Sequence, residues 1–482
     1  MSIGEGVRPR GGILINSSKD IASSRFPTVA HVTTIPATEM AMQVLGEPIA
    51  NIALLAAFLT LTDLIPLAAL QAVLTHRFEG EALDRNIHLM NEAAARVTPR
   101  PGRIQAMLRP IEGSAAVAHA VALCRPQVIA AYPITPQTHI VEKLVRLIAD
   151  DQLRCELISV ESEFSAISAV LGAAAAGSRA YTASSAQGIL LMTEVLHNIA
   201  GLRIPLVMTC ANRAIGAPVS AWSDQQDSMV MRDTGWIQLY CADNQEAVDT
   251  TIQAFRIAER SELPVMVCMD GYVLTHTLEV VDIPTQQQVD AFLPAYHFAR
   301  ALDPRKPITI GTLVTPEFYT KARYMNHRAL LRAQEEILAA DRDWEKISGR
   351  TSGGLISVDD SDDAPVGILS IGSVMGTLSD ARDHFAEFGP VKLIGLRSMR
   401  PFPIDDLKVA CDGLSELIVL ERALSPGGGG IIGSEVRAAP MSCVTRVKIN
   451  SPVSPRPSAS HSAWRDWCRS ASRASTCNSS AW

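Results

Sequence analysis

The sequence predicts an α/β protein built from parallel sheets that carry helices on both faces. Two observations predict this class. Over residues 104–290, short apolar runs typical of strands alternate with segments that have apolar residues at helical spacing. The same alternation returns over 365–437. Strands that alternate with helices pair in parallel, so we expect two α/β domains, and a chain of 482 residues leaves room for about one more.

Residues 1–98 are expected to form part of this further domain. The run 12–16 predicts a short strand, and the turn at 35–39 predicts the start of a helix. An apolar stretch over 52–74 contains Asp63, Pro66 and Gln71. Buried helices interrupted at Pro66 explain this stretch better than a membrane span, which needs ~20 apolar residues with few charges.

The middle region, 99–290, is expected to be one domain, entered through a proline-containing linker at 96–103. Its apolar runs predict strands, and its 3.6-residue periodicity predicts helices between them. The predicted strands are 127–134, 153–160, 179–184, 205–210 and 264–269, and the predicted helices are 138–149, 163–176, 188–202 and 245–261.

The remaining residues divide into three parts. A helical linker region is predicted over 291–364, with a charged helix at 318–347 followed by a loose Gly-, Ser- and Asp-rich linker. A smaller α/β domain is predicted over 365–439. Its expected strands are 366–371, 391–395 and 417–420, with a helix at 381–388 and a flexible glycine loop at 427–430. The tail, 440–482, lacks periodicity and is predicted to be irregular and disordered.

Charge and cysteine content exclude several classes. A net charge of −7 gives no basic surface for nucleic acid. The nine cysteines contain no Cys-x-x-Cys pair, which excludes the usual iron–sulfur and zinc spacings on this chain and favours reduced thiols in a cytoplasm. The first residues lack the pattern of a signal peptide, and we expect neither secretion nor membrane insertion.

Four polar clusters follow predicted strands of the middle domain. Strand-end loops of a parallel sheet converge on one edge, where such sheets bind ligands. Each cluster also has a purely structural explanation, because hydroxyls and carboxylates cap helices and arginines form surface ion pairs. Their convergence favours a binding site. The clusters lie at 132–136, 160–164, 182–188 and 212–227, the last with a loop at 224–227 that reads as solvated.

These clusters resemble the alpha subunit of the pyruvate:ferredoxin oxidoreductase family. The resemblance is carried by 132–136, 162–163, 182–188, 212–214, 224–227 and 270–271, and in the smaller domain by 371–377 and 420–422. It implies a thiamine-diphosphate-binding pyrimidine-type domain over 99–290, followed by a transketolase C-terminal-like domain over 365–439. Residues 11–95 resemble the C-terminal half of the gamma subunit, so the chain resembles a gamma–alpha fusion with a partial gamma-type α/β domain.

The resemblance implies oxidative decarboxylation of pyruvate with coenzyme A, giving acetyl-CoA, CO2 and reduced ferredoxin. By the same resemblance, Glu163 would bind N1′ of the cofactor's aminopyrimidine, and Thr135 and Arg213 would hold the substrate carboxylate. Pro133, Ser184 and Gln187 would contact the cofactor. Arginine suits a carboxylate because its planar guanidinium pairs with it through two hydrogen bonds.

Two parts of such an enzyme are missing from the sequence. It contains neither a Gly-Asp-Gly segment for Mg²⁺ and diphosphate nor a cysteine cluster. In the resembled family these lie on partner beta and delta subunits, so the Mg²⁺ and iron–sulfur clusters are expected there. Two alternatives stay open: a 2-oxoglutarate or branched-chain 2-oxoacid enzyme, and a non-catalytic truncated subunit that only binds partners.

Overall fold

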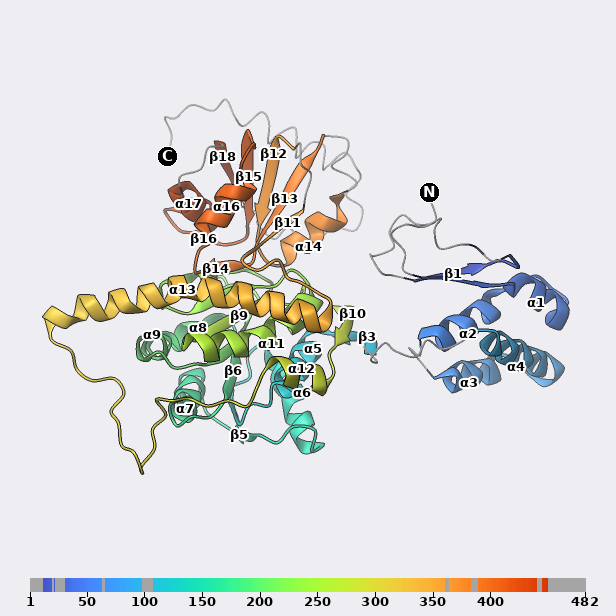
Figure 1. Ribbon diagram of the computed structural model, residues 1–482, viewed down its shortest axis with the longest axis horizontal. Helices are drawn as coiled ribbons and strands as arrows, with labels where there is room; N and C mark the ends of the chain where they lie inside the picture. The colour runs from blue at the N-terminus through green and yellow to red at the C-terminus, as the bar shows by residue number, and fades with distance from the viewer. Residues whose placement is uncertain are drawn as a thin grey trace. The chain divides into compact units, whose positions relative to one another are not determined.

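A computed structural model describes residues 12–19, 21, 31–62, 66–97, 107–359, 364–382, 389–439 and 444–449. The chain divides into two compact units, Met1–Arg109 and Pro110–Trp482. In Figure 1 the first unit is blue and the second runs from cyan to red.

The first unit combines two parallel strands with four helices. The strands pair in register from Gly12 with His31 to Asn16 with Ile35, and the Asn16 amide side chain accepts a hydrogen bond from the backbone N–H of Thr38 (3.2 Å). That N–H belongs to the first turn of a helix and has no partner within it. The elements are β1 Gly12–Asn16, β2 His31–Ile35, α1 Ala37–Leu45, α2 Asn51–Thr62, α3 Leu67–Arg77 and α4 Gly80–Ala95.

The apolar stretch over 52–74 forms two helices, as predicted. α3 begins directly after Pro66, and α2 and α3 bury small and apolar side chains against Leu89 and Met90 of α4. Among the helices that the structure describes, none is both long and apolar enough to cross a bilayer. The predicted strand at 12–16 and the helix that starts in the 35–39 turn are confirmed.

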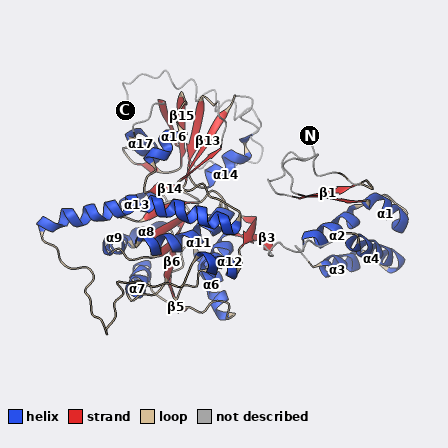
Figure 2. Cartoon of the chain, in the orientation of Figure 1, coloured by secondary structure: helices blue, strands red, loops and turns tan. Residues whose placement is uncertain are grey.

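The larger unit contains a seven-stranded sheet with the strand order β14-β8-β9-β7-β6-β4-β5. Figure 2 colours the strands of the chain red and its helices blue. Every pairing in it is parallel except that of β14 with β8 at one edge. The five predicted strands are confirmed, with shorter bounds for the first two. β8 and β14 were not predicted. The strands are β4 Val128–Ala130, β5 Glu156–Ile158, β6 Ala180–Ser184, β7 Val207–Asn212, β8 Ile237–Tyr240, β9 Val265–Asp270 and β14 Ser398–Arg400.

Helices cover both faces of this sheet, as predicted. On one face α5, α6 and α11 form an apolar core that continues to Trp344 of α13, and on the other face α7 and α9 form a second core. The predicted helix over 188–202 is two helices, α8 and α9. The helices here are α5 Gly113–Leu123, α6 Thr138–Ala149, α7 Glu163–Ala175, α8 Ala186–Leu191, α9 Thr193–Leu202, α10 Gln226–Val230, α11 Asn244–Ser261, α12 Gln286–Phe292 and α13 Pro316–Ser348.

A second sheet of five strands has the order β11-β13-β12-β15-β18. The three strands predicted in this part are confirmed, and β11 pairs antiparallel with β13. Most of the helix predicted over 381–388 falls on residues 383–388, outside the described part, and the observed helix is α14. The elements are β11 Ile356–Asp359, β12 Val366–Ser370, α14 Ser373–Asp380, β13 Val391–Leu396, α16 Ile404–Ala410, β15 Glu416–Glu421, α17 Ile431–Ala438 and β18 Val444–Ile449.

Two sequence predictions need correction here. The prediction that 440–482 is irregular was wrong for 444–449, because β18 pairs in parallel with β15 from Val444 to Ile449. β18 contains four β-branched residues, which favour extended backbone. Residues 450–482 lie outside the described part. The glycine run predicted as a loop instead ends in β17 Gly429–Gly430, which pairs with β16 Leu424–Ser425.

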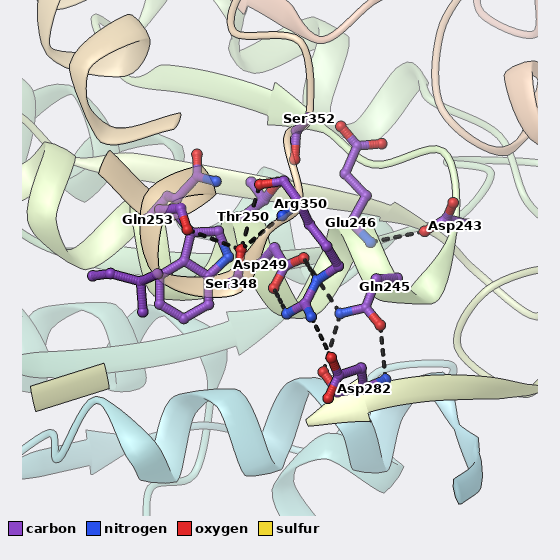
Figure 3. Close-up of polar contacts among 12 residues, drawn as sticks. Asp243, Gln245, Glu246, Asp249, Thr250, Gln253, Asp282, Ser348, Arg350 and Ser352 are labelled. Carbon is purple, nitrogen blue, oxygen red and sulfur yellow. Dashed lines mark hydrogen bonds and ion pairs between the residues drawn. The ribbon is translucent and has the colours of Figure 1, made fainter. Parts of the chain in front are cut away.

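The first part of the segment predicted as a loose linker, 348–364, is held by charged groups. Arg350 donates from Nε and Nη2 to both carboxylate oxygens of Asp249 on α11 (2.7 and 2.8 Å) and also pairs with Asp282 (Figure 3). Asp341 accepts hydrogen bonds from the backbone N–H groups of Ser352 (3.0 Å) and Gly354 (3.0 Å). Glycine and serine are therefore frequent over 348–354 because the backbone turns tightly against buried carboxylates.

Candidate functional site

The first cluster is a rigid turn after β4. The Thr135–Pro136 peptide bond is cis. Gln137 is fully buried, and its side-chain amide donates to the carbonyl of Ala183 on β6 (2.9 Å) and accepts from the backbone N–H of Ile134 (3.3 Å). These bonds fix the turn to the neighbouring strand, with Pro136 buried and Thr135 exposed.

Gly271, directly after β9, supports this turn from behind. A Cβ atom on it would lie 2.5 Å from the carbonyl oxygen of Asn212 and 2.6 Å from Cγ of Pro136. Its backbone N–H donates to that same Asn212 carbonyl (2.9 Å). Only glycine allows the ends of β7 and β9 and the proline turn to approach this closely.

Glu163 lies in the first turn of α7 and is buried, with 8% of its surface exposed. It packs against Gly188 of α8. A Cβ atom at position 188 would lie 2.7 Å from Oε1 of Glu163 and 2.4 Å from Oγ of Ser184. The start of α7 and the end of β6 therefore bring a carboxylate and a hydroxyl together across a position without a side chain.

Two hydroxyls beside this carboxylate have no hydrogen-bond partner. Among the residues that the structure describes, Ser184 Oγ and Ser185 Oγ are buried without a partner. Buried polar atoms are normally paired, and unpaired ones cost roughly 1–3 kcal/mol each. These hydroxyls and the Glu163 carboxylate can offer both hydrogen-bond donors and acceptors to a ligand.

Arg213 lies directly after β7 and is half-buried. Its guanidinium donates to the carbonyls of Thr135 (Nη1, 2.9 Å) and Ser220 (Nε, 3.1 Å). A guanidinium has five N–H donors, so three remain for a ligand. The structure thus brings the Arg213 guanidinium to the backbone of Thr135 at the proline turn.

Asp227 ties the strand-end loops to one another. Its fully buried carboxylate accepts from the backbone N–H groups of Ala186 (3.0 Å), Arg213 (2.9 Å) and Ser228 (2.8 Å) and from the Asn212 side chain (2.8 Å). Burial raises the pKa of Asp227 to about 6, although all four donors act to lower it. The interpretation of 224–227 as a solvated loop was wrong for Gln225 and Asp227, which are fully buried. Most of their side-chain hydrogen-bond partners come from segments that are distant in sequence.

Asp270, at the end of β9, connects the two α/β domains. Its buried carboxylate accepts from Gln225 Nε2 (3.1 Å) in the first domain. From the second domain it accepts from the Ser373 backbone (2.8 Å) and hydroxyl (2.6 Å) and from Arg422 Nη1 (3.0 Å). Gly372 has φ +66°, and a Cβ there would lie 2.9 Å from Asp270 Oδ2. The 270–271, 371–377 and 420–422 motifs thus meet at one carboxylate.

The predicted site residues fall into two groups. Glu163 and Ser184 are adjacent, and so are Thr135 and Arg213. Pro133 is exposed in the turn after β4, and Gln187 is half-buried in the first turn of α8. The sequence prediction assigned no role to Asp227 or Asp270. A possible signal for Asp270 was an acidic residue followed by glycine directly after a buried strand.

The chain matches three family models. Residues 119–341 match "Pyruvate flavodoxin/ferredoxin oxidoreductase, thiamine diP-bdg", residues 2–96 match "Pyruvate ferredoxin/flavodoxin oxidoreductase", and residues 364–453 match "Pyruvate:ferredoxin oxidoreductase core domain II". Curated relatives include pyruvate synthase subunit PorA of Methanosarcina barkeri, 44% identical over 71% of this chain and 86% of that protein. The chain belongs to the pyruvate:ferredoxin oxidoreductase family. It is an oxidoreductase subunit of this class, with a thiamine-diphosphate-binding domain and an N-terminal region of the gamma type.

Two further relatives give the range of the family. PorA of Methanothermobacter thermautotrophicus is 43% identical over 69% of this chain and 87% of its own length. Ketoisovalerate oxidoreductase subunit VorA of Pyrococcus abyssi is 41% identical over 68% of this chain and 84% of its own length. Among solved structures, the 2-oxoglutarate:ferredoxin oxidoreductase of Magnetococcus marinus has a TM-score of 0.59 at 19% identity and covers 96% of this chain and 85% of that one. That likeness supports the α/β fold.

The contact behind the proline turn gives a stability prediction. Gly271→Ala would place a methyl group against Pro136 and the Asn212 carbonyl, and overpacking of this kind costs roughly 1–3 kcal/mol. We expect a lower unfolding midpoint in urea, followed by circular dichroism. Gly172→Ala is the control. Gly172 is exposed in α7 with nothing within 4 Å of its Cβ position, so alanine should stabilise by about 0.5–1 kcal/mol. Equal midpoints for the two variants would contradict the close contact.

Proposed function

We propose that this chain is the alpha-type catalytic subunit of an enzyme that oxidatively decarboxylates pyruvate with coenzyme A. The products are acetyl-CoA, CO2 and an electron pair that passes to ferredoxin. The observation that carries the proposal is the buried Glu163 carboxylate beside the unpartnered Ser184 hydroxyl, in a domain of the thiamine-diphosphate-binding type. The relatives named pyruvate synthase favour pyruvate as the substrate.

The hydrogen-bonding groups of Glu163 and Ser184 match part of thiamine diphosphate in their chemistry. An aminopyrimidine offers ring nitrogens and an amino group, which match a carboxylate and free hydroxyls. In this proposal Glu163 shares a proton with N1′, and Pro133, Ser184 and Gln187 line the same ring. When bound, thiamine diphosphate supplies the nucleophilic carbon and the electron sink of the reaction. The chain's own contribution is to orient the ring and to hold the proton at N1′.

Arg213 and Thr135 are proposed to bind the substrate carboxylate. The arginine is oriented by two backbone carbonyls, and its remaining N–H groups match the two oxygens of a carboxylate. Asp227, which accepts from the backbone of both Arg213 and Ala186, keeps this arginine in a constant position relative to the start of α8. Substrate and cofactor groups would then be positioned by one buried carboxylate.

The rest of the active site is proposed to lie on partner subunits. The sequence has neither a Gly-Asp-Gly segment nor a cysteine cluster. A beta subunit would therefore bring Mg²⁺ and the diphosphate contacts, and beta and delta subunits would bring the iron–sulfur clusters that reduce ferredoxin. The proposed compartment is the cytoplasm, where iron–sulfur chemistry and free thiols are compatible.

Reconstitution tests the proposed function. We expect coenzyme A-dependent viologen reduction only when the chain is combined with a beta-type partner, because the chain alone has no route for electrons. The 2-oxoacids to compare are pyruvate, 2-oxoisovalerate and 2-oxoglutarate, ranked by kcat/KM. A higher value for 2-oxoisovalerate would favour the alternative suggested by the VorA relative. Turnover by the purified chain alone, or none with any partner, would overturn the proposal.

Glu163→Gln tests the role of the buried carboxylate. Glutamine keeps the shape but cannot hold the proton, so hydrogen–deuterium exchange at C2 of the bound cofactor should slow by ~10²–10⁴-fold in the assembled enzyme. Glu161→Gln is the control, since Glu161 is exposed and bonds the Ser165 hydroxyl. Exchange at the wild-type rate in Glu163→Gln would mean that this carboxylate only stabilises the start of α7.

Arg213→Lys tests carboxylate binding. Lysine keeps the charge and loses the paired geometry, and a charge-assisted hydrogen bond contributes about 1.5–3 kcal/mol. We therefore expect KM for pyruvate to rise roughly 10- to 100-fold, while circular dichroism shows that the variant stays folded. Arg154→Lys is the control. The Arg154 side chain is 89% exposed and forms an ion pair with Asp151, so this change should leave KM for pyruvate unchanged. An unchanged KM together with a lowered midpoint in Arg213→Lys would make Arg213 a structural residue instead.

A further inference from the structure

Three side chains with metal-ligating groups meet outside the residues proposed for cofactor and substrate. One ligand atom from each of Glu112, His139 and His276 lies within 4.8 Å of the other two. They come from separate elements: Glu112 ends β3 Met107–Glu112, His139 is in the first turn of α6, and His276 lies between β9 and β10 Leu278–Ile283. Their meeting is therefore a result of the tertiary fold.

The backbone holds two of these elements together tightly. Ser114 donates to the Thr275 carbonyl from its backbone N–H (3.0 Å) and its hydroxyl (2.9 Å), and Gly113 donates to the Thr277 carbonyl (3.3 Å). A Cβ at position 113 would lie 2.1 Å from the Leu274 carbonyl oxygen. The residue that follows Glu112 must therefore be glycine, and Glu112 is held close to His276.

The side chains have the chemistry of a ligand set. The carboxylate of Glu112 is 2.6 Å from Nδ1 of His139, and the two imidazole rings are 4.6 Å apart between centroids. The hydroxyl of Thr275 bonds Nδ1 of His276 (2.7 Å), which orients that ring and leaves its other nitrogen for a ligand.

We propose that Glu112, His139 and His276 bind a divalent transition-metal cation of the zinc class. Two imidazoles and one carboxylate suit zinc and its first-row neighbours, whereas Mg²⁺ and Ca²⁺ prefer oxygen ligands alone. Zinc–ligand bonds of ~2.0–2.2 Å in a tetrahedral site place the ligand atoms ~3.3 Å from one another. Side-chain rotations that move each ligand atom by about 1 Å would bring the three groups to this separation. His139 and Glu112 are partly exposed, with 47% and 29% of their side chains accessible, which lets an ion enter and leaves a position for water.

Such an ion would fasten three segments that also position the proposed substrate site. His139 begins the helix that follows the Thr135–Pro136 turn, and His276 stacks on Tyr272 (4.6 Å), which directly follows Gly271. Tyr272 in turn packs against Trp222 (5.1 Å) in the loop after Arg213. The bound cation would hold both sides of the substrate turn without contacting the substrate, so this inference does not depend on the proposed reaction.

Zinc binding to the full chain tests the proposal. The chain is stripped with a chelator and titrated with Zn²⁺ in competition with a chromophoric chelator. We expect one zinc equivalent in the wild type, and binding weaker by about tenfold or more in His139→Gln and in His276→Gln. His197→Gln, an exposed histidine on α9, is the control and should bind as the wild type does. Circular dichroism establishes that each variant is folded.

Cobalt identifies the ligands. Co²⁺ in the wild type should show visible bands of a nitrogen and oxygen site without a thiolate charge-transfer band, and His276→Gln should lose these bands. Glu112→Gln offers a second variant if a histidine variant fails to fold. Equal zinc affinity in wild type and ligand variants, a thiolate band, or no stoichiometric binding would each overturn the proposal. None of these results depends on 2-oxoacid turnover.

Discussion

The buried carboxylate of Asp270 is the interaction on which the arrangement of the larger unit depends. It stands where the central strand β9 ends and accepts hydrogen bonds from Gln225 in one domain and from Ser373 and Arg422 in the other. A buried charge whose partners are removed is costly, roughly 3–5 kcal/mol. These bonds therefore favour one arrangement of the two domains. Arg422 also donates to the Ser223 hydroxyl and so fixes the loop that contains Ser223.

Asp227 holds the strand-end loops together, as Asp270 holds the two α/β domains together. Groups that must cooperate in a site come from separate loops, and each loop alone would be free to shift. A single carboxylate that bonds the backbone at Ala186, Arg213 and Ser228 removes that freedom. Glycine at 188 allows close packing between Glu163 and Ser184, and glycine at 271 allows close packing against the proline turn. Buried polar groups beneath the proposed site fix the positions of its side chains, as in other preorganised sites.

Local patterns foretold most of the strands and long helices of the larger unit and the convergence of its polar loops. α6 has the predicted bounds because its apolar residues repeat at helical spacing over a full twelve residues. β8, β14 and β11 are only three or four residues long and are defined by distant partners, which periodicity does not show. The roles of Arg350, Asp227 and Asp270 were missed for the same reason, because each has partners far away in sequence.

The first sheet is completed by the edge strand β14, which lies late in the sequence and is therefore synthesised late. Residues 398–400 pair with β8, residues 237–240, after a whole helical region and part of the second domain have intervened. A growing chain emerges from its N-terminus, so β8 presents an open edge until the codons near 400 have been translated. Open edges invite pairing with other chains. The two α/β domains have separate sheets, but the first sheet is complete only after residues 398–400 have been synthesised. If translation stops between the two domains, the first sheet lacks its edge strand β14.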